Sequence, residues 1–345
     1  MRIDEPPAAD GLENQDALPE RPGKRNEFEQ RLGRLPAGHP SSPVEADGTP
    51  RPPEPGLRCR ESPDASPPGD ADWRPLTDAE YAEHITNVRD RLDKARADGL
   101  ATDRQHTIDP AREVWSAERE TLQDSIIEDL YRNASGVPCE RRAIMAGGLP
   151  GAGKSTILEG HAGIDRSQYL MINPDEIKEE MASRDMIPPV EGLSPMEASD
   201  LVHEESSHVA KRLARRAQAD GKNVIWDVTM SSRESTEWRI NSLRAVGYTR
   251  IEGIFVDIPV EISVTRAGGR HREGHDNYRA GDGLGGRFVP AEMIRAQADP
   301  EWGSRNRKTF EEVKQRFDGW QRFDNSAASP VLAEASRGEE DHDWY

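Results

Sequence analysis

The stretch "AIMAGGLPGAGKST", Ala143–Thr156, joins a short apolar run to four glycines and a Lys-Ser-Thr triplet. Its centre matches the pattern G-x-x-x-x-G-K-[ST]. Glycines let the backbone curl so that consecutive N–H groups point at phosphate oxygens, in conformations that side chains would obstruct. The stretch therefore predicts a phosphate-binding loop between a strand and a helix. The residues of the pattern are Gly148, Leu149, Pro150, Gly151, Ala152, Gly153, Lys154 and Ser155.

The polar end of this loop predicts the cofactors. Lys154 would place a positive charge near the β- and γ-phosphates of a nucleotide, and Ser155 would offer its hydroxyl to Mg²⁺. The helix that follows would point its N-terminus at the same anion. Thr156 adds a neighbouring hydroxyl. We therefore expect ATP and Mg²⁺ as cofactors, with residues 148–156 binding the nucleotide.

Composition excludes several classes of partner. The 345 residues carry a net charge of −18, which argues against a general affinity for nucleic acids or for anionic membranes. Cys59 and Cys139 match no metal or redox spacing. The start, "MRIDEPPAADG", lacks the features of a signal peptide, and no apolar run approaches the roughly 18 residues of a membrane span. We expect a cytoplasmic protein without nucleic-acid or membrane partners.

The chain divides into four parts by composition. Residues 1–75 form a Pro-rich acidic tail with few residues able to bury apolar area, and we expect this tail to be disordered. It is either a flexible tail without specific function or a docking segment. Residues 76–137 read as a helical N-terminal extension, residues 138–336 as the main α/β domain, and residues 337–345 as an acidic C-terminal tail.

Two amphipathic helices are predicted in the extension. The first spans Thr77–Gly99, because "TDAE" is a capping box with Thr77 as N-cap and Gly99 is a typical helix end. The second spans Asp109–Tyr131, because Asp109-Pro110 reads as a cap followed by a first-turn proline. Its apolar stripe would comprise Trp115, Leu122, Ile126 and Leu130.

After Pro138, short apolar strands alternate with helices. One of these helices opens with a second capping box, "SPME", from Ser194 to Glu197. Alternation of this kind implies a parallel sheet with helices on both faces, since parallel neighbours require a crossover connection. The fold class is therefore α/β, a three-layer sandwich. The strands are predicted at residues 142–146, 169–172, 223–227, 250–257 and, more weakly, 320–324.

Two carboxylates follow predicted strands, where open α/β sheets place their sites. Asp175, in "LMINPDEIK", is a candidate base that would accept the proton of an acceptor hydroxyl during phosphoryl transfer. The alternative is a helix-capping role. Asp227, in "NVIWDVTM", would hold Mg²⁺ together with Ser155, or orient substrate with Thr229 as partner; a structural role is the alternative.

A basic cluster supplies the positive charge that phosphoryl transfer requires. Arg270 and Arg287 are the predicted catalytic arginines, with Arg266 and Arg272 close by; the alternative is a set of solvated surface arginines. Between them, Gly281–Gly286 formally matches G-x-G-x-x-G, but it follows a basic helix rather than a strand. We interpret it as a lid loop or a solvated linker, and not as a dinucleotide site.

The acids and histidines of the helices give weaker signals. Glu204 and Glu205 could contact substrate over the edge of the sheet, or could face solvent. The histidines near them and near the arginines do not follow H-E-x-x-H or another ligand spacing, so zinc is not predicted from the sequence. They are His203, His208, His271 and His275.

With these residues in place, the chain resembles the zeta-toxin family of P-loop kinases, which is related to chloramphenicol phosphotransferase. The resemblance covers roughly Arg141 to Ala335 and rests on the order of six phrases: "GGLPGAGKST", "INPDEIK", "HEESSHVAKRLARRAQADGKNVIWDVTM", "VDIPVEISVTRAGGR", "GGRFVP" and "FDNS". It implies a P-loop kinase-like sheet of five parallel strands in the order 2-3-1-4-5. It also implies ATP-dependent phosphorylation of a sugar hydroxyl, with UDP-N-acetylglucosamine as substrate.

The resemblance also assigns roles by position. It implies that Lys154 and Ser155 bind ATP and Mg²⁺, that Asp175 is the base, and that Asp227 and Thr229 face the substrate. Arg270 and Arg287 would clamp the phosphates. In the toxin systems a separate helical antitoxin blocks the nucleotide site. We therefore consider two possible covers, a helical antitoxin partner or the two N-terminal helices acting in cis, with simple packing of these helices against the core as the alternative.

Other functions remain to be distinguished. The chain could be an ATP-binding regulatory P-loop module without kinase activity, because such loops alone do not prescribe catalysis. It could also phosphorylate another small alcohol, as an antibiotic phosphotransferase does. A polynucleotide kinase would need a basic groove with stacking aromatics. The net charge of −18 and an aromatic content of 6% disfavour that function.

Overall fold

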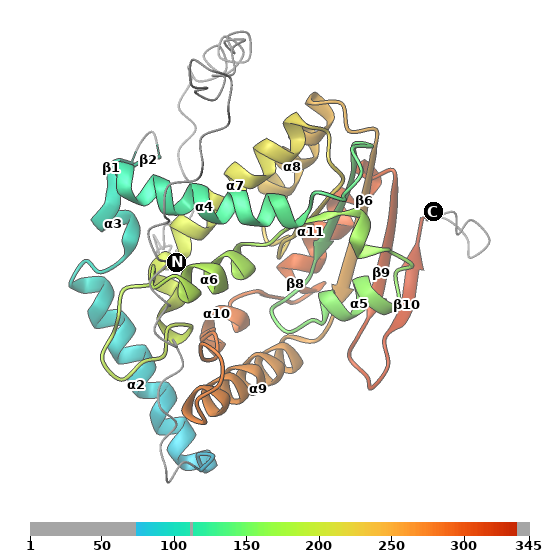
Figure 1. The fold of residues 1–345 in the computed structure, drawn as a ribbon. Helices are drawn as coiled ribbons and strands as arrows, with labels where there is room; N and C mark the ends of the chain where they lie inside the picture. The colour runs from blue at the N-terminus through green and yellow to red at the C-terminus, as the bar shows by residue number, and fades with distance from the viewer. Residues whose placement is uncertain (1–73, 111–112, 337–345) are drawn as a thin grey trace, which may run out of the picture. The chain divides into compact units, whose positions relative to one another are not determined.

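The computed structural model describes residues 74–110 and 113–336. The predicted tails, residues 1–75 and 337–345, fall outside the described residues except for Arg74 and Pro75. The described part is built around one central sheet with helices on both faces (Figure 1). The α/β class is therefore confirmed.

The central sheet has six strands in the order β10-β9-β6-β3-β5-β4. Five of them are parallel. When these five are numbered by their order along the chain, their order across the sheet is 2-3-1-4-5, as the resemblance implies. The sixth, β10, was not predicted and pairs with β9 in the antiparallel direction at the edge. The strands are β3 (Arg142–Gly147), β4 (Leu170–Ile172), β5 (Val224–Asp227), β6 (Arg250–Asp257), β9 (Gly319–Asp324) and β10 (Val331–Ala335).

Helices connect these strands. The connections on the main sheet are α5 (Lys154–Gly160), η2 (Arg166–Gln168), α6 (Pro174–Ser183), η3 (Glu197–Val202), α7 (His203–Ala219), α8 (Arg233–Ala245), α9 (Val260–Arg279), α10 (Ala291–Arg295), α11 (Arg305–Val313) and η4 (Lys314–Arg316). A small hairpin of β7 (Ala298–Asp299) and β8 (Gly303–Ser304) lies between α10 and α11. The extension contains α2 (Asp78–Ala97), α3 (Thr102–His106), β1 (Thr107–Asp109), β2 (Val114–Trp115) and α4 (Ala117–Asn133).

The sheet has an apolar core on each face. Successive side chains of a strand point to opposite faces, so Ile144 and Met145 enter different clusters. The Met145 face packs against α6, α7, α8 and α11, and the Ile144 face against α5. A parallel strand that is buried on both faces reads as a continuous apolar run. This explains why β3 could be recognised from sequence.

The start of the first N-terminal helix is confirmed and that of the second is wrong. In α2, the Thr77 side chain and Glu80 form the predicted capping box. The second helix begins at Ala117 instead of Asp109, because the Ser116 hydroxyl accepts the N–H of Arg119 and supplies the cap. Asp109 ends strand β1 of a small hairpin whose second strand carries Trp115. A proline after a strand suits a turn as well as a helix start.

The second predicted capping box also forms. The Ser194 hydroxyl and N–H both donate to the Glu197 carboxylate, and the Glu197 N–H donates to the Ser194 hydroxyl. The helix that it opens is the 3₁₀ helix η3, which continues directly into α7. Glu197 is almost fully buried at this position.

The helices of the extension pack against the main domain. Helix α4 lies along α7 and is joined to it by the buried Arg119 guanidinium, whose Nε and Nη2 donate to the two oxygens of Glu205 at 2.7 and 2.8 Å. Gln123 donates to the same carboxylate at 2.9 Å. A buried carboxylate needs such partners because an unpaired charge in the interior is strongly unfavourable.

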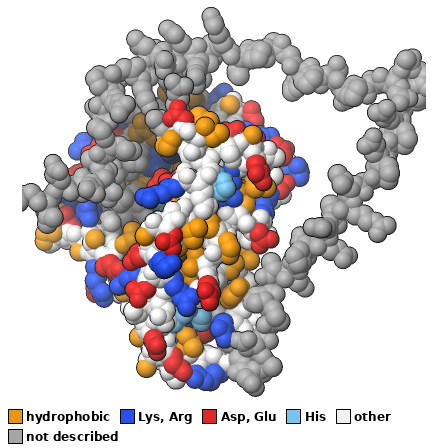
Figure 2. Space-filling view, turned by 90° about the vertical axis from the view of Figure 1, so that its left-hand side faces the viewer, with side chains coloured by type: hydrophobic (Ala, Val, Ile, Leu, Met, Phe, Trp, Pro, Cys, Tyr) orange, Lys and Arg blue, Asp and Glu red, His pale blue; other side chains and the backbone are white. Residues whose placement is uncertain are grey.

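Helix α2 joins the domain at α9. The Arg272 guanidinium donates to Asp78 and lies over the ring of Tyr81, whose hydroxyl contacts the far side of α9 at Gly268 and His271. Figure 2 shows the face to the left in Figure 1, where side chains of both charges are interspersed. None of the helices in the described residues is long and apolar enough to cross a bilayer.

We predict that Arg119→Ala lowers the free energy of unfolding by about 3–5 kcal/mol, because it leaves the Glu205 carboxylate buried without its counter-charge. Urea denaturation would measure the change. Arg132→Ala is the matched control on α4, since Arg132 forms an exposed pair with Asp129 and its loss should change stability by no more than about 0.5 kcal/mol. Equal effects of the two substitutions would contradict the prediction.

Candidate functional site

The phosphate-binding loop lies between β3 and α5 and has the backbone conformation that its glycines predict. Gly151 and Gly153 have φ values of 73° and 87°, in the left-handed region, and Gly153 is the N-cap of α5. A Cβ atom on Gly148 would come within 2.4 Å of the Val256 carbonyl oxygen in β6. The loop can therefore sit this close to the sheet only with glycine at that position.

Three hydrogen bonds hold the loop in place. The Asn325 side chain donates to the Ala152 carbonyl at 2.7 Å, and the Ser263 hydroxyl donates to the Pro150 carbonyl at 2.6 Å. The Gly148 N–H donates to the Thr229 carbonyl at 3.3 Å. Asn325 and Ser263 were not predicted as site residues. The phrase "FDNS" drew attention to the end of β9, but no sequence signal showed which backbone group Asn325 contacts.

The ends of β3, β4 and β5 meet at one ion pair. Lys154 Nζ lies 3.3 Å from Asp227 Oδ1, and the Asn173 side chain donates to Asp227 Oδ2 at 3.3 Å. Both charged side chains are mostly buried, with exposed fractions of 14% for Lys154 and 15% for Asp227. Asp227 therefore lies beside the loop, and whether it holds Mg²⁺ or orients substrate stays a prediction.

Asp175 lies in the first turn of α6, but the capping function belongs to its neighbour. Asn173 is the N-cap, and its side chain accepts the N–H of Asp175 at 2.9 Å. The carboxylate of Asp175 is left to pair with the Arg287 guanidinium, and its Oδ1 lies 3.5 Å from Lys178 Nζ. Its side chain therefore does not cap α6 and lies among positive charges instead.

Burial and neighbouring charges act in opposite directions on Asp175. Burial alone would raise the pKa of its carboxyl, but the positive charges of Arg287 and Lys178 outweigh burial and hold the pKa below its ordinary value. Burial lowers the pKa of Lys178, which is 7% exposed. Asp175 is thus ionised and able to accept a hydrogen bond at neutral pH.

Two cavities meet at these residues. The first, of about 870 Å³, is lined by residues 150–156 of the loop and by α9. The second, of about 460 Å³, lies over the loop after β5 and the start of α8. Lys154, Asp175, Asp227 and Arg287 line both. A group bound in one cavity would therefore meet a group bound in the other at the Asp175 carboxylate.

The predicted nucleotide-binding residues divide into two sets. Residues 150–156, including Ser155 and Thr156, line the first cavity. Gly148 and Leu149 do not line it, and Leu149 is buried in the apolar cluster beside α5. These two residues lie on the side of the loop that faces the sheet, away from the cavity.

The arginines of the basic cluster have different places. Arg266, Arg270 and Arg287 line the first cavity. Burial lowers the pKa of Arg270, and the charge of Arg287 adds to this effect. Arg272 points away and holds α2. Residues 281–286 form a loop on α9, with Gly285 and Gly286 in the cavity wall, and whether this loop moves as a lid stays a prediction.

The second cavity has a strained loop and an unusual arginine. Thr229 lines it, and whether it faces substrate stays a prediction. It is followed by Met230, whose φ of 55° is rare for a side chain of this size. Arg239 of α8 also lines it. Burial lowers the pKa of Arg239, and its described polar contacts are to Ser235 alone, without a carboxylate.

Three predictions are wrong. Glu205 does not face substrate, since it is fully buried against Arg119 on the far side of α7. Glu204 is exposed and lines a separate small cavity with Arg96 and Asp103. The two N-terminal helices do not act as an in-cis cover, because neither cavity is lined by any described residue before Pro150. These helices pack on the flank of the domain.

The fold and this arrangement define a P-loop kinase-like protein, and comparison with known proteins identifies the family. The zeta toxin family model matches residues 135–326, more than half of the chain. The chain belongs to the zeta toxin family. A search of curated proteins gave no match.

Two solved structures of the same complex agree with the fold. A chain of the AvrRxo1-ORF1:AvrRxo1-ORF2 complex with sulphate ions is 16% identical, with a TM-score of 0.51. The same complex with ATP gives 15% identity and a TM-score of 0.52. In both cases the match covers 68% of this chain and 76% of the other. A chain from the PezAT toxin-antitoxin system of Streptococcus pneumoniae is 15% identical over 62% of this chain and 83% of its own, with a TM-score of 0.43.

We predict that the stability advantage of the native chain over Asp175→Asn shrinks as the pH falls below about 4, the ordinary pKa of an unfolded aspartate. A carboxyl whose folded pKa is lowered contributes stability above its unfolded pKa, and this contribution is lost as protons bind. Urea denaturation of both proteins between pH 6 and pH 3 would measure it. Asp282→Asn, on the exposed loop after α9, is the control. A difference that grows on acidification would contradict the prediction.

Proposed function

We propose that this protein is an ATP-dependent small-molecule kinase that transfers the γ-phosphate of ATP to a hydroxyl of a sugar nucleotide. The observation that carries the proposal is the ionised Asp175 at the junction of the two cavities, beside Lys154 and Arg287. Membership of the zeta toxin family supports it. UDP-N-acetylglucosamine, which the family resemblance implies, is the acceptor that we would test first.

The first cavity fits the triphosphate of ATP. The loop conformation, with Gly151 and Gly153 in the left-handed region, the N-terminus of α5 and Lys154 would together form an anion site. Mg²⁺, when bound, would neutralise negative charge on the phosphates. Ser155 and Asp227 line the same cavity and would hold it. Lys154 would then exchange its contact with Asp227 for the phosphates.

Asp175 would act on the acceptor. Its carboxylate would accept a hydrogen bond from the acceptor hydroxyl and align the oxygen for in-line attack on the γ-phosphorus. The hydroxyl proton passes to Asp175 as the new P–O bond forms and the bond to ADP breaks. Arg287, released from Asp175, and Arg270 would stabilise the charge on the transferred group.

The second cavity favours an anionic acceptor. Arg239 is a desolvated guanidinium that contacts Ser235 and lies over the Trp226 ring, but it has no carboxylate partner in the described chain. Burying such charges is unfavourable unless an anion pairs with them. A sugar nucleotide carries a diphosphate that could supply this charge. Thr229, Ser232 and Ser235 offer hydroxyls for the remaining polar groups.

The alternative functions differ in what they require of Asp175. A regulatory module that binds ATP without transferring phosphate would not need an ionised carboxylate between two cavities. A kinase for an uncharged alcohol would leave Arg239 without a counter-charge.

We also propose a protein partner that acts as an antitoxin. The two-component AvrRxo1-ORF1:AvrRxo1-ORF2 complex, which contains a chain of similar fold, supports this proposal. The absence of an in-cis cover among the described residues also supports it.

We predict that Asp175→Asn lowers kcat for phosphoryl transfer by about 10²–10⁴-fold, because the positioned base is lost, while ATP affinity stays within a few-fold. Lys154→Ala should instead weaken ATP binding. Mass spectrometry of a nucleotide-sugar panel incubated with ATP and Mg²⁺ would identify the product, and calorimetry would measure ATP binding. Retention of full transfer by Asp175→Asn would overturn the proposed role.

We predict that Arg239→Gln raises KM for an anionic acceptor about 10–100-fold, because a hydrogen bond to a charged group contributes roughly 1.5–3 kcal/mol. KM for ATP should not change. Arg233→Gln is the matched control, since Arg233 lies on the same helix, is exposed and pairs with Glu237. Equal effects of the two substitutions on acceptor KM would show that Arg239 does not contact the acceptor.

A further inference from the structure

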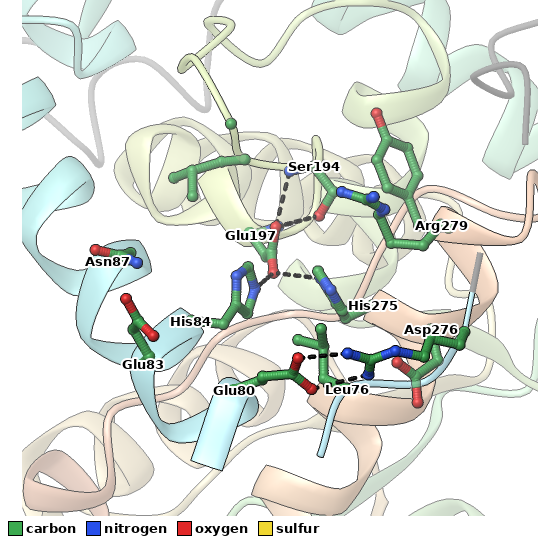
Figure 3. Close-up of a pocket in the computed structure, with 14 residues that line it drawn as sticks. Leu76, Glu80, Glu83, His84, Asn87, Ser194, Glu197, His275, Asp276 and Arg279 are labelled. Carbon is green, nitrogen blue, oxygen red and sulfur yellow. Dashed lines mark hydrogen bonds and ion pairs between the residues drawn. The ribbon is translucent and has the colours of Figure 1, made fainter. Parts of the chain in front are cut away.

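A third cavity, of about 850 Å³, lies apart from the proposed kinase site. It is bounded by α2, by the segment before η3 and by the last turns of α9 (Figure 3). Figure 3 shows His84 of α2, Glu197 at the start of η3 and His275 of α9 converging at its wall. The proposed function uses none of the three residues.

Glu197 is the centre of this cluster. Its Oε2 atom accepts from the N–H and the hydroxyl of Ser194, at 2.8 and 2.9 Å, in the capping box. Its Oε1 atom faces three imidazoles, with distances of 2.6 Å to His84 Nε2, 3.2 Å to His275 Nδ1 and 3.2 Å to His271 Nε2. The side chains of Glu197, His271 and His275 are each less than 10% exposed.

Hydrogen bonds alone do not satisfy these nitrogens. A carboxylate oxygen has two lone pairs, yet three imidazole nitrogens point at Oε1. The Tyr81 hydroxyl has one hydrogen and two possible acceptors, the Gly268 carbonyl at 3.0 Å and His271 Nδ1 at 2.7 Å. His271 Nε2 is left buried without a hydrogen-bond partner of good geometry. A nitrogen that is not a donor to Oε1 presents a lone pair beside the carboxylate, and a lone pair next to an anion is an environment that a cation stabilises.

We propose that His84, Glu197 and His275 bind one divalent transition-metal ion of the zinc class. Their donor atoms all lie within 4.8 Å of one another. A tetrahedral ion with bonds of about 2.0–2.1 Å needs donors roughly 3.3 Å apart, so small side-chain rotations bring the three atoms into range. Two imidazoles and a carboxylate form a ligand set that zinc uses in proteins. The cavity admits solvent as the fourth ligand.

The surroundings suit such a site. His271 contacts Glu197 Oε1 and is itself hydrogen-bonded to Tyr81, so it would orient the carboxylate from outside the ligand set. Ser194 fixes the other carboxylate oxygen. The ligands are 113 and 78 residues apart from Glu197 along the chain, which is why no sequence spacing predicts them. The ion would cross-link α2 to η3 and α9.

The test is zinc binding by the full chain carrying no polyhistidine tag. We expect one Zn²⁺ per chain after dialysis, a saturable titration in competition with a chromophoric chelator, and a melting temperature that rises with zinc concentration. His84→Ala and His275→Ala should each weaken zinc binding by more than about 100-fold, since even the loss of an outer partner of a ligand costs 10–100-fold. His161→Ala, at an exposed position after α5, should bind as the native chain does.

Glu197→Gln is the variant that separates metal binding from folding. Glutamine can also close a capping box, so the start of η3 is retained while the ligand charge is lost. This variant should keep the native circular dichroism spectrum and lose tight zinc binding. The proposal is overturned if the native chain shows no saturable zinc binding, as a purely hydrogen-bonded cluster would, or if the His84, His275 and Glu197 variants all retain native affinity. Zinc content is measured without phosphoryl transfer, so this result is independent of the proposed kinase function.

Discussion

The close approach of the phosphate-binding loop to the sheet is the constraint on which the site depends. Gly148 passes so near the Val256 carbonyl that no side chain fits, and the loop then turns through left-handed glycines into α5. This path sets the N-terminus of α5 and Lys154 opposite the end of β5, where Asp227 lies. Asn325 and Ser263 fix the outer carbonyls of the loop from β9 and α9. The loop is therefore held by three neighbouring elements, and its N–H groups keep their direction without a ligand.

Electrostatics in this acidic chain are organised locally rather than by net charge. The chain carries −18 overall, yet the junction of the two cavities gathers Lys154, Lys178 and Arg287 around Asp175. Partial burial strengthens each of these interactions, because the surrounding dielectric is lower than that of water. The same burial makes an unpaired cation unfavourable. A site that keeps Arg239 desolvated without a carboxylate is thus prepared for an anion, and this is the link between its geometry and the proposed acceptor.

Most of the fold could be predicted from local sequence patterns. Contacts between side chains that are far apart in the sequence could not be predicted. The loop motif, the apolar strands and both capping boxes involve residues within a few positions of each other, so sequence carries their signal directly. The start of α4 was missed because Asp109-Pro110 satisfies the rules for a turn as well as for a helix cap. Strand β10 was missed because as an edge strand it is only partly buried. Glu205 was expected to contact substrate or to face solvent, but α4 supplies its partner Arg119. Arg272 was placed in the basic cluster, but α2 supplies its partner Asp78. The histidine cluster likewise needs His84 from α2.

Helix α9 connects the N-terminal extension to the nucleotide cavity. Near its start Ser263 contacts the phosphate-binding loop, in its middle Arg266 and Arg270 line the cavity, and beyond them His271, Arg272 and His275 contact α2 or Glu197. Arg270 and His275 are five residues apart, about 7.5 Å along the helix. The contacts that His271 and Arg272 make with α2 therefore lie within one turn of the arginines that line the cavity. The extension therefore packs against the same helix that carries Arg266 and Arg270, and it does so on the flank of the domain without lining either cavity.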